Sequence, residues 1–264
     1  MKPTFLTYEQ PLLTLLFSGK TPAEVAGKVT RAIREGAEGF CLQTCQLEAQ
    51  YRNREDYRKI FSAMENRPVY VTNYRHGVNE TASDQTIAEG LVELAESGAT
   101  LCDVMGDLFG PQPGELTVNP EAVQKQKQLI RRIHQAGAEV IMSSHVLVFT
   151  PAERVLEIAL AQQERGAYGG AGFIVGVVQV FEIGAQVADA HDDVRLQNLR
   201  ITNLLKKELK TPFLFLSGGE CQLHRRIGPM LGCCMYLCSL DDEEEPKPVQ
   251  PMLRKIKAIR DNWR

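Results

Sequence analysis

The chain has 264 residues, of which 44% are hydrophobic and 24% are charged, and its formal net charge at pH 7 is -3. This length is enough to bury a large core without disulfides or metals. The slight acidity gives no reason to expect nucleic acid, because a nucleic-acid-binding face usually has a basic surplus. No run of about 18 apolar residues is present, so we expect no membrane-spanning helix.

Eight short and nearly continuous apolar runs follow one another along the chain, as is typical of parallel strands that are covered on both faces. We predict strands at Leu12–Phe17, Gly39–Gln43, Val69–Asn73, Thr100–Met105, Glu139–Ser143, Gly172–Val178, Phe213–Leu216 and Cys233–Cys238. Helical stretches separate these runs. Eight alternations of strand and helix favour an α/β fold, a (β/α)8 (TIM) barrel forming one domain over residues 1–264, with an open doubly wound sheet as the alternative.

The predicted helices open with clear start signals. Thr21-Pro22-Ala23-Glu24 offers an N-cap, a proline at the first helical position and an acid in the first turn. Asn119-Pro120 and Thr150-Pro151 repeat this opening, and Gly137 is a plausible C-terminal cap. We expect a last helix over Val249–Asp261, preceded by an acidic solvated loop.

The amino terminus and the cysteines both indicate a cytoplasmic protein. Prolines and polar residues interrupt the first apolar stretch before a signal-peptide core could form, so we expect a short lead-in to the first strand. The seven cysteines are scattered, and five lie in or beside apolar runs, as buried reduced thiols do. Their two C-x3-C pairs are a poor match to a structural zinc site, which needs tighter spacing.

Polar side chains follow most of the predicted strands, and in (β/α)8 barrels the active site lies at those C-terminal strand ends. Arg75 follows the third strand and Arg225 follows the seventh. A guanidinium fork matches carboxylate and phosphate, and Ser217, Gly218 and Gly219 can bring backbone N–H groups close to an anion. We therefore predict a site for a small anionic metabolite. Surface arginines and a simple glycine turn are the alternative.

His145 directly follows the fifth predicted strand. Histidine is the most frequent acid/base catalyst because its pKa lies near neutrality, so we predict that His145 is catalytic. The alternative is an internal histidine that only satisfies its own hydrogen bonds. Other polar residues at strand ends are candidates to assist or to bind a metal: His76, Asp103, Asp107, Glu182 and Glu220.

The segment Glu139–His145, followed by Thr150-Pro151, resembles the catalytic-histidine strand of the type I 3-dehydroquinate dehydratases. Arg75 is placed like that family's arginine after strand 3, and Arg225 like its substrate-carboxylate arginine. The resemblance covers most of the chain. It implies a (β/α)8 barrel, a lyase (dehydratase-like) activity and a homodimer.

The sequence departs from this family at the residues of covalent catalysis. Family members form a Schiff base through a lysine on strand 6, but here that position falls near Phe173, and no lysine occurs between residues 127 and 206. Without an amine no iminium can form. By the same resemblance, the family's glutamate partner of the histidine becomes Met105, and the acid and arginine that end strand 2 become Gln43 and Cys45.

Three functions remain open. In the first, a non-covalent lyase or isomerase binds a small hydroxylated or keto carboxylate through Arg75, Arg225 and Gln43, with His145 as general acid/base and no cofactor. In the second, strand-end His, Asp and Glu side chains, including His76, hold a divalent metal that replaces the Schiff base.

The third function is an inactive barrel that binds a metabolite or a partner protein. The partly apolar stretch Val180–Val187 belongs to a long connection after the sixth predicted strand, which mildly favours a changed role. An extra helical turn packed on the barrel is the alternative there.

Overall fold

Eight parallel strands form the centre of the protein in the computed structural model, which describes residues 3–5, 10–146, 150–166, 172–176, 190–217, 219–240 and 250–262. The strands are β1 (Leu12–Phe17), β2 (Gly39–Gln43), β3 (Val69–Thr72), β4 (Leu101–Met105), β5 (Glu139–Ser143), β6 (Gly172–Gly176), β7 (Phe213–Leu216) and β8 (Met235–Cys238). They form one sheet in the order β7-β6-β5-β4-β3-β2-β1-β8, and each pair of neighbours in this order is parallel. The α/β prediction with strand and helix in alternation is thereby confirmed.

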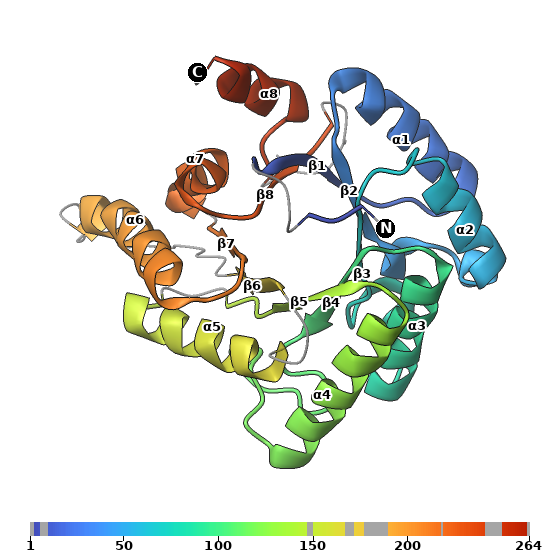
Figure 1. Ribbon diagram of the computed structural model, residues 1–264, viewed down its shortest axis with the longest axis horizontal. Helices are drawn as coiled ribbons and strands as arrows, with labels where there is room; N and C mark the ends of the chain where they lie inside the picture. The colour runs from blue at the N-terminus through green and yellow to red at the C-terminus, as the bar shows by residue number, and fades with distance from the viewer. Residues whose placement is uncertain are drawn as a thin grey trace.

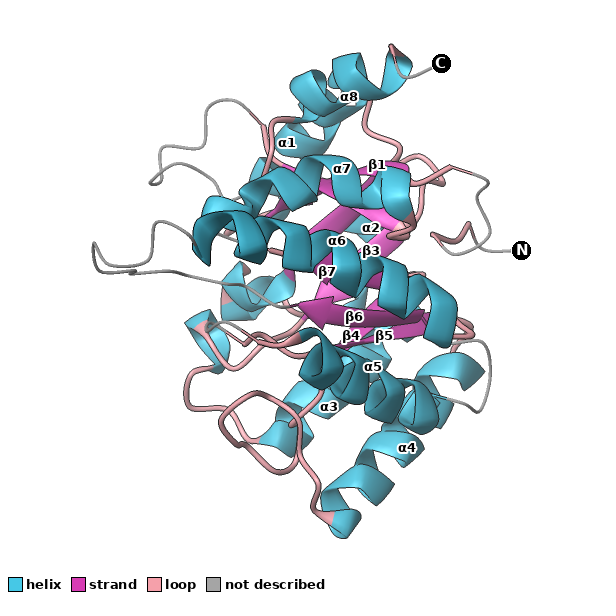
Figure 2. Cartoon of the chain, turned by 90° about the vertical axis from the view of Figure 1, so that its left-hand side faces the viewer, coloured by secondary structure: helices cyan, strands magenta, loops and turns pink. Residues whose placement is uncertain are grey.

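The helices lie outside these strands, as Figure 1 and the side view of Figure 2 show. They are α1 (Pro22–Glu35), α2 (Arg54–Ser62), α3 (Asp84–Ser97), α4 (Pro120–Gln135), α5 (Ala152–Gly166), α6 (Ala190–Glu208), α7 (Leu223–Leu231) and α8 (Leu253–Asp261). Short 3-10 turns are η1 (Thr44–Gln46), η2 (Ala49–Tyr51), η3 (Gly77–Asn79) and η4 (Gly219–Gln222). None of the described helices is long and apolar enough to cross a membrane.

The start signals read from the sequence act as predicted. The Thr21 side chain accepts a hydrogen bond from the backbone N–H of Glu24, with Pro22 in the first turn. Asn119 caps α4 in the same way, accepting from the N–H groups of Glu121 and Ala122. Each cap satisfies backbone donors that the first helical turn leaves without a partner.

Strand β3 ends at Thr72 rather than Asn73, and β4 begins at Leu101 rather than Thr100, so each is one residue shorter than predicted. Two further predicted boundaries were wrong for local reasons. The last helix begins at Leu253 rather than Val249, because Pro251 disfavours helical backbone before it and Met252 forms a bridge with Ser239. Strand β8 begins at Met235 rather than Cys233, because the backbone N–H of Cys233 binds the Gly228 carbonyl and so belongs to the end of α7.

Alternate residues of each strand face opposite sides. Cys41 and Gln43 of β2, and Tyr70 and Thr72 of β3, face a common cavity. The residues between them pack with the apolar faces of the helices in a large core cluster. This separation follows from the two-residue period of a strand. It brings polar side chains together at one end of an otherwise apolar sheet.

The strands β7 and β8 lie at the two ends of the sheet order. The backbone N–H of Cys234, just before β8, donates to the Phe213 carbonyl of β7 at 2.8 Å. This hydrogen bond joins the start of β7 to the residue before β8, at the two ends of the sheet order. Some predictions lie outside the described residues: Gly218, Glu182, the stretch Val180–Val187 and the acidic loop before α8.

Candidate active site

A cavity of about 430 Å³ opens at the C-terminal ends of the strands. Five of the residues predicted from the sequence line it together: Gln43 at the end of β2, Arg75 and His76 after β3, His145 after β5 and Arg225 on α7. The other lining residues are Leu16, Cys41, Tyr70, Thr72, Tyr74, Met105, Glu115, Leu216, Leu237 and Gln250. Its place agrees with the predicted end of the sheet.

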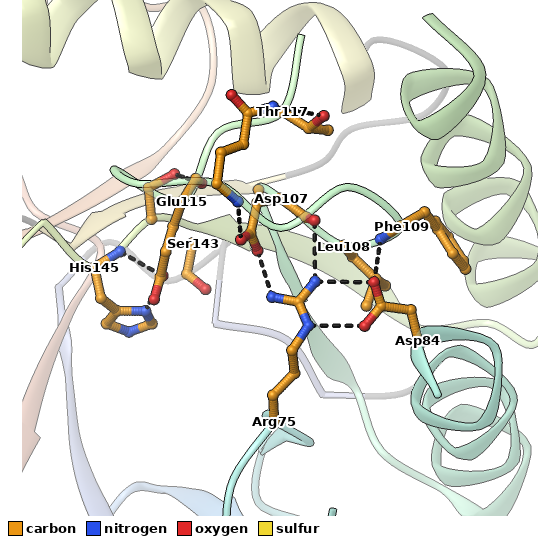
Figure 3. Close-up of polar contacts among 12 residues, drawn as sticks. Arg75, Asp84, Asp107, Leu108, Phe109, Glu115, Thr117, Ser143 and His145 are labelled. Carbon is orange, nitrogen blue, oxygen red and sulfur yellow. Dashed lines mark hydrogen bonds and ion pairs between the residues drawn. The ribbon is translucent and has the colours of Figure 1, made fainter. Parts of the chain in front are cut away.

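His145 is bound to a carboxylate that the sequence did not single out. One oxygen of Glu115 accepts both the His145 backbone N–H at 2.7 Å and the ring Nδ1–H at 2.8 Å (Figure 3). Both side chains are 34% exposed, so the pair borders the cavity rather than lying beneath it. A ring held at Nδ1 leaves Nε2 as the nitrogen for exchange with a ligand.

The two partners change each other's pKa. Burial alone would lower the pKa of His145, but the hydrogen bond and charge of Glu115, helped by the charge of Asp103, outweigh it and raise that pKa. Burial alone would raise the pKa of Glu115, and the hydrogen bond and charge of His145 outweigh it and lower that pKa. His145 is therefore biased toward its protonated, acidic form.

Glu115→Gln is expected to lower stability most between pH 4.5 and 6.5, the ordinary pKa values of the two groups. The raised pKa of His145 stabilises the fold below pH 6.5, and this contribution is lost as pH rises through the folded value. The lowered pKa of Glu115 stabilises above pH 4.5, and this contribution is lost as pH falls through the folded value. Urea denaturation of both proteins across this range measures the difference in their free energies of unfolding. A difference that does not change with pH would contradict the coupling between Glu115 and His145.

The replacement of the family's glutamate by Met105 does not leave His145 without a carboxylate partner. Met105 does line the cavity at the end of β4, as the resemblance implied, but Glu115 in the loop after β4 supplies the carboxylate instead. A sequence signal did exist, since residues 106–119 form a connection of the length that is often functional. The contact itself depends on how that loop folds back, which no local pattern reveals.

Arg225 is a buried cation at the cavity wall, 4% exposed. Its Nε donates to the Ser217 carbonyl at 2.6 Å and one Nη donates to the Gln250 amide oxygen at 2.8 Å. No carboxylate pairs with it among the residues that the structure describes. Burial lowers the pKa of Arg225 to about 10, which still leaves it charged near neutral pH. A desolvated guanidinium with unused donors is suited to a carboxylate ligand.

Arg75 lies beside the cavity but is already occupied by two carboxylates (Figure 3). Its Nε and one Nη donate to Asp84 at 2.7 and 3.0 Å, and its other Nη donates to Asp107 at 2.8 Å. Burial alone would lower the pKa of Arg75, but these hydrogen bonds and charges raise it above its ordinary value. Arg75 thus has little capacity left for a substrate, and Asp107 serves it as a counter-ion.

Asp103 lies beneath the cavity floor, where three hydroxyl groups saturate it. The phenols of Tyr70 and Tyr74 both donate to one oxygen at 2.5 Å, and the Ser143 hydroxyl donates to the other at 2.6 Å. Burial raises the pKa of Asp103 although these hydrogen bonds oppose the shift. With its oxygens so engaged, Asp103 is poorly placed to bind a metal.

His76 also lines the cavity, and the rings of both His76 and His145 contact Tyr74. The Tyr74 ring centroid lies 5.8 Å from that of His76 and 5.1 Å from that of His145. Burial, and then the charge of His145, lower the pKa of His76. The two histidines thus differ in protonation, which is the pattern of an acid and a base in one site.

Ser217 does not line the cavity. The Ser217 hydroxyl donates to Asn198 at 3.2 Å, so this residue contributes through its carbonyl, which holds Arg225. Gly219 and Glu220 begin η4, and only their backbone is described. In the described part of the chain no three His, Cys, Asp or Glu side chains converge as metal ligands.

The sequence matches no protein-family description and no curated protein. The fold, by contrast, has close counterparts among solved enzymes of one class, the 3-dehydroquinate dehydratases. The enzyme from Geobacillus kaustophilus HTA426 superposes with a TM-score of 0.74 at 15% identity, covering 98% of this chain and 94% of that one.

The type I enzyme from Clostridium difficile gives a TM-score of 0.75 at 17% identity, over 96% of this chain and 92% of that chain. The Enterococcus faecalis enzyme gives 0.70 at 15% identity, over 98% and 96%. The chain therefore shares the fold of these enzymes over 96–98% of its length.

Proposed function

We propose that this protein is a divergent relative of the type I 3-dehydroquinate dehydratases that acts as a non-covalent lyase or isomerase on a small hydroxylated or keto carboxylate. One observation carries the proposal. Arg225, a buried arginine without a carboxylate partner in the described chain, faces the same cavity as His145. The pKa of that histidine is raised by its carboxylate partner. The fold supports it through the dehydratases that it resembles.

Each step can be assigned to a residue. Arg225, steadied by Gln250, binds the substrate carboxylate. His76, neutral near pH 7, removes a proton from the carbon next to the carbonyl or carboxylate. The electrons of that C–H bond form a C=C bond while the neighbouring C–O bond breaks, and His145 donates its proton to the departing hydroxyl, which leaves as water.

Two further features belong to the proposal. We propose that the sheet closes between β7 and β8 into a single-domain (β/α)8 barrel, which the hydrogen bond from Cys234 to Phe213 supports. From the resemblance alone we also propose a cytoplasmic homodimer.

The metal-dependent alternative is weaker because its ligands are otherwise engaged. Asp103, its buried carboxylate candidate, already accepts three hydroxyl hydrogen bonds from Tyr70, Tyr74 and Ser143. The inactive, metabolite-binding alternative shares the same anion site, so only turnover separates it from the lyase.

The proposal is tested by incubating the purified protein with 3-dehydroquinate and following the ultraviolet absorbance of a conjugated enone product. A parallel sample is first treated with a chelator, which leaves a metal-free lyase unaffected. Turnover in both samples is the expected result, and loss on chelation would favour the metal-dependent enzyme. A flat trace with 3-dehydroquinate and with other hydroxylated carboxylates would leave only the binding function.

A further inference from the structure

We propose that Arg165 is a positioning residue: from helix α5 it fixes the loop of residues 106–119 so that Glu115 meets His145. This inference rests on the proposed role of His145 as the acid. It concerns a residue that lies outside the cavity and touches no substrate.

The loop holds Glu115 in a backbone conformation that must be imposed on it. Glu115 has a φ of 47° and the preceding Gly114 a φ of 84°, both in the left-handed region. For a residue other than glycine this region is sterically unfavourable, and it persists only where surrounding contacts enforce it. The carboxylate of Glu115 therefore reaches His145 at an energetic cost that another part of the structure must offset.

Arg165 binds the loop where its two ends meet. One Nη donates to the Gly106 carbonyl at 2.8 Å, and the other donates to the Thr117 carbonyl. The Thr117 N–H also donates to the Gly106 carbonyl at 3.1 Å, which closes the loop at its base. Glu115 lies two residues before Thr117, so Arg165 fixes the stem from which Glu115 projects.

Glutamines on neighbouring helices complete this support. Gln126 of α4 donates to the Gly106 and Leu108 carbonyls at 3.1 and 2.8 Å and accepts from Arg165 at 3.0 Å. Gln162 of α5 donates to the Ser144 hydroxyl at 3.0 Å, and Ser144 donates to the Glu115 carbonyl at 2.6 Å. Two residues of α5 thus act on Glu115: Arg165 through the stem of the loop, and Gln162 through Ser144 and the Glu115 carbonyl.

Burial of Arg165 removes water from its charge, and packing contacts alone do not offset that loss. Arg165 is 5% exposed, and in the described chain no carboxylate forms an ion pair with it. Burial lowers its pKa, as expected for a cation that has lost water. Its fork satisfies two loop carbonyls and one amide oxygen at once, which neither lysine nor an apolar residue can do.

The loop stem has no room to adjust. A Cβ atom added at Gly106 would lie 2.5 Å from the Glu115 carbonyl oxygen and 2.7 Å from the Ser144 hydroxyl. The stem and Glu115 are therefore packed directly on each other, so a displacement at Arg165 is transmitted to the carboxylate.

The test is a histidine NMR titration of the substrate-free protein, with His145 assigned from its Ala variant. Besides Glu115, the charged and titratable groups near His145 are Asp103, Arg225, His76 and Tyr74, and none is altered by Arg165→Met. That variant is expected to lower the His145 pKa to the value found in Glu115→Gln, and the double variant should lower it no further. Arg132→Met is the matched control, because Arg132 lies exposed on α4 and pairs with Glu89 of α3 in the ion pair that the variant removes.

A folded Arg165→Met protein with the wild-type His145 pKa overturns the proposal, because a merely structural arginine would change stability and not this titration. If Arg165→Met does not fold, Arg165→Lys decides instead, since one ammonium keeps the buried charge but cannot hold two carbonyls as the fork does. An unchanged His145 pKa in Arg165→Lys would likewise overturn the proposal. The readout needs no turnover, so it stands apart from any failure of the lyase assignment.

Discussion

His145→Gln is expected to lower kcat by roughly 10²–10⁴-fold on any hydroxylated carboxylate that the protein dehydrates, because the leaving hydroxyl then departs without its proton. Carboxylate binding should change little, since Arg225 and Gln250 remain in place. Glutamine is close to histidine in size and can still donate a hydrogen bond to Glu115. The loss should therefore appear in kcat rather than in KM.

Steady-state kinetics on the wild type and the variant measure this effect, with thermal denaturation to confirm folding. His134→Gln is the matched control, since His134 is a half-buried histidine on α4 that does not line the cavity. Retention of full turnover in His145→Gln would remove His145 from the mechanism. The wild-type rate should also fall as pH rises through the raised pKa of His145, since the acid is then lost.

Arg225→Met is expected to weaken binding of carboxylate ligands at least about 30-fold, which corresponds to about 2 kcal/mol. The reason is that the buried guanidinium is the only described cation on the cavity wall without a carboxylate partner, whereas Arg75 is held by Asp84 and Asp107. Methionine has a similar length and fills the space without charge.

Isothermal titration with 3-dehydroquinate, and with citrate as a simple carboxylate, measures this affinity. Arg226→Met is the control, because Arg226 is the next residue on α7 but is exposed and donates only a weak hydrogen bond to the Gln222 carbonyl at 3.4 Å. Equal affinities of Arg225→Met and wild type would mean that the anion binds elsewhere. Binding by neither protein would refute the anion site.

Much of the fold could be predicted from the sequence because it depends on local patterns. Short apolar runs predicted the bounds of β1, β2, β5 and β7 correctly, and Thr21 and Asn119 cap helices as their residue types indicate. The errors occur where a distant or competing contact decides. Cys233 is apolar enough for a strand, yet its N–H completes the end of α7.

The candidate site divides in the same way. Position at a strand end was enough to place His145, His76 and Arg225 around one cavity. It could not show that Arg75 is paired with Asp107, nor that Glu115 reaches His145, because both contacts depend on how the loop after β4 folds. Strand ends are fixed by the sheet, whereas loop side chains are fixed by tertiary contacts that sequence spacing does not encode.

The placement of Glu115 on a loop has a consequence for how such a protein can diversify. The strands form the core of the molecule. The pKa of His145, by contrast, is raised by Glu115 on a loop whose two ends are held by hydrogen bonds from Arg165. Exchange of residues 107–116 between homologous scaffolds, with Gly106, Thr117 and Arg165 retained, would then retune the working pH or the preferred leaving group without redesign of the core. The sheet with its helices and the chemistry of the site could in this sense be inherited separately.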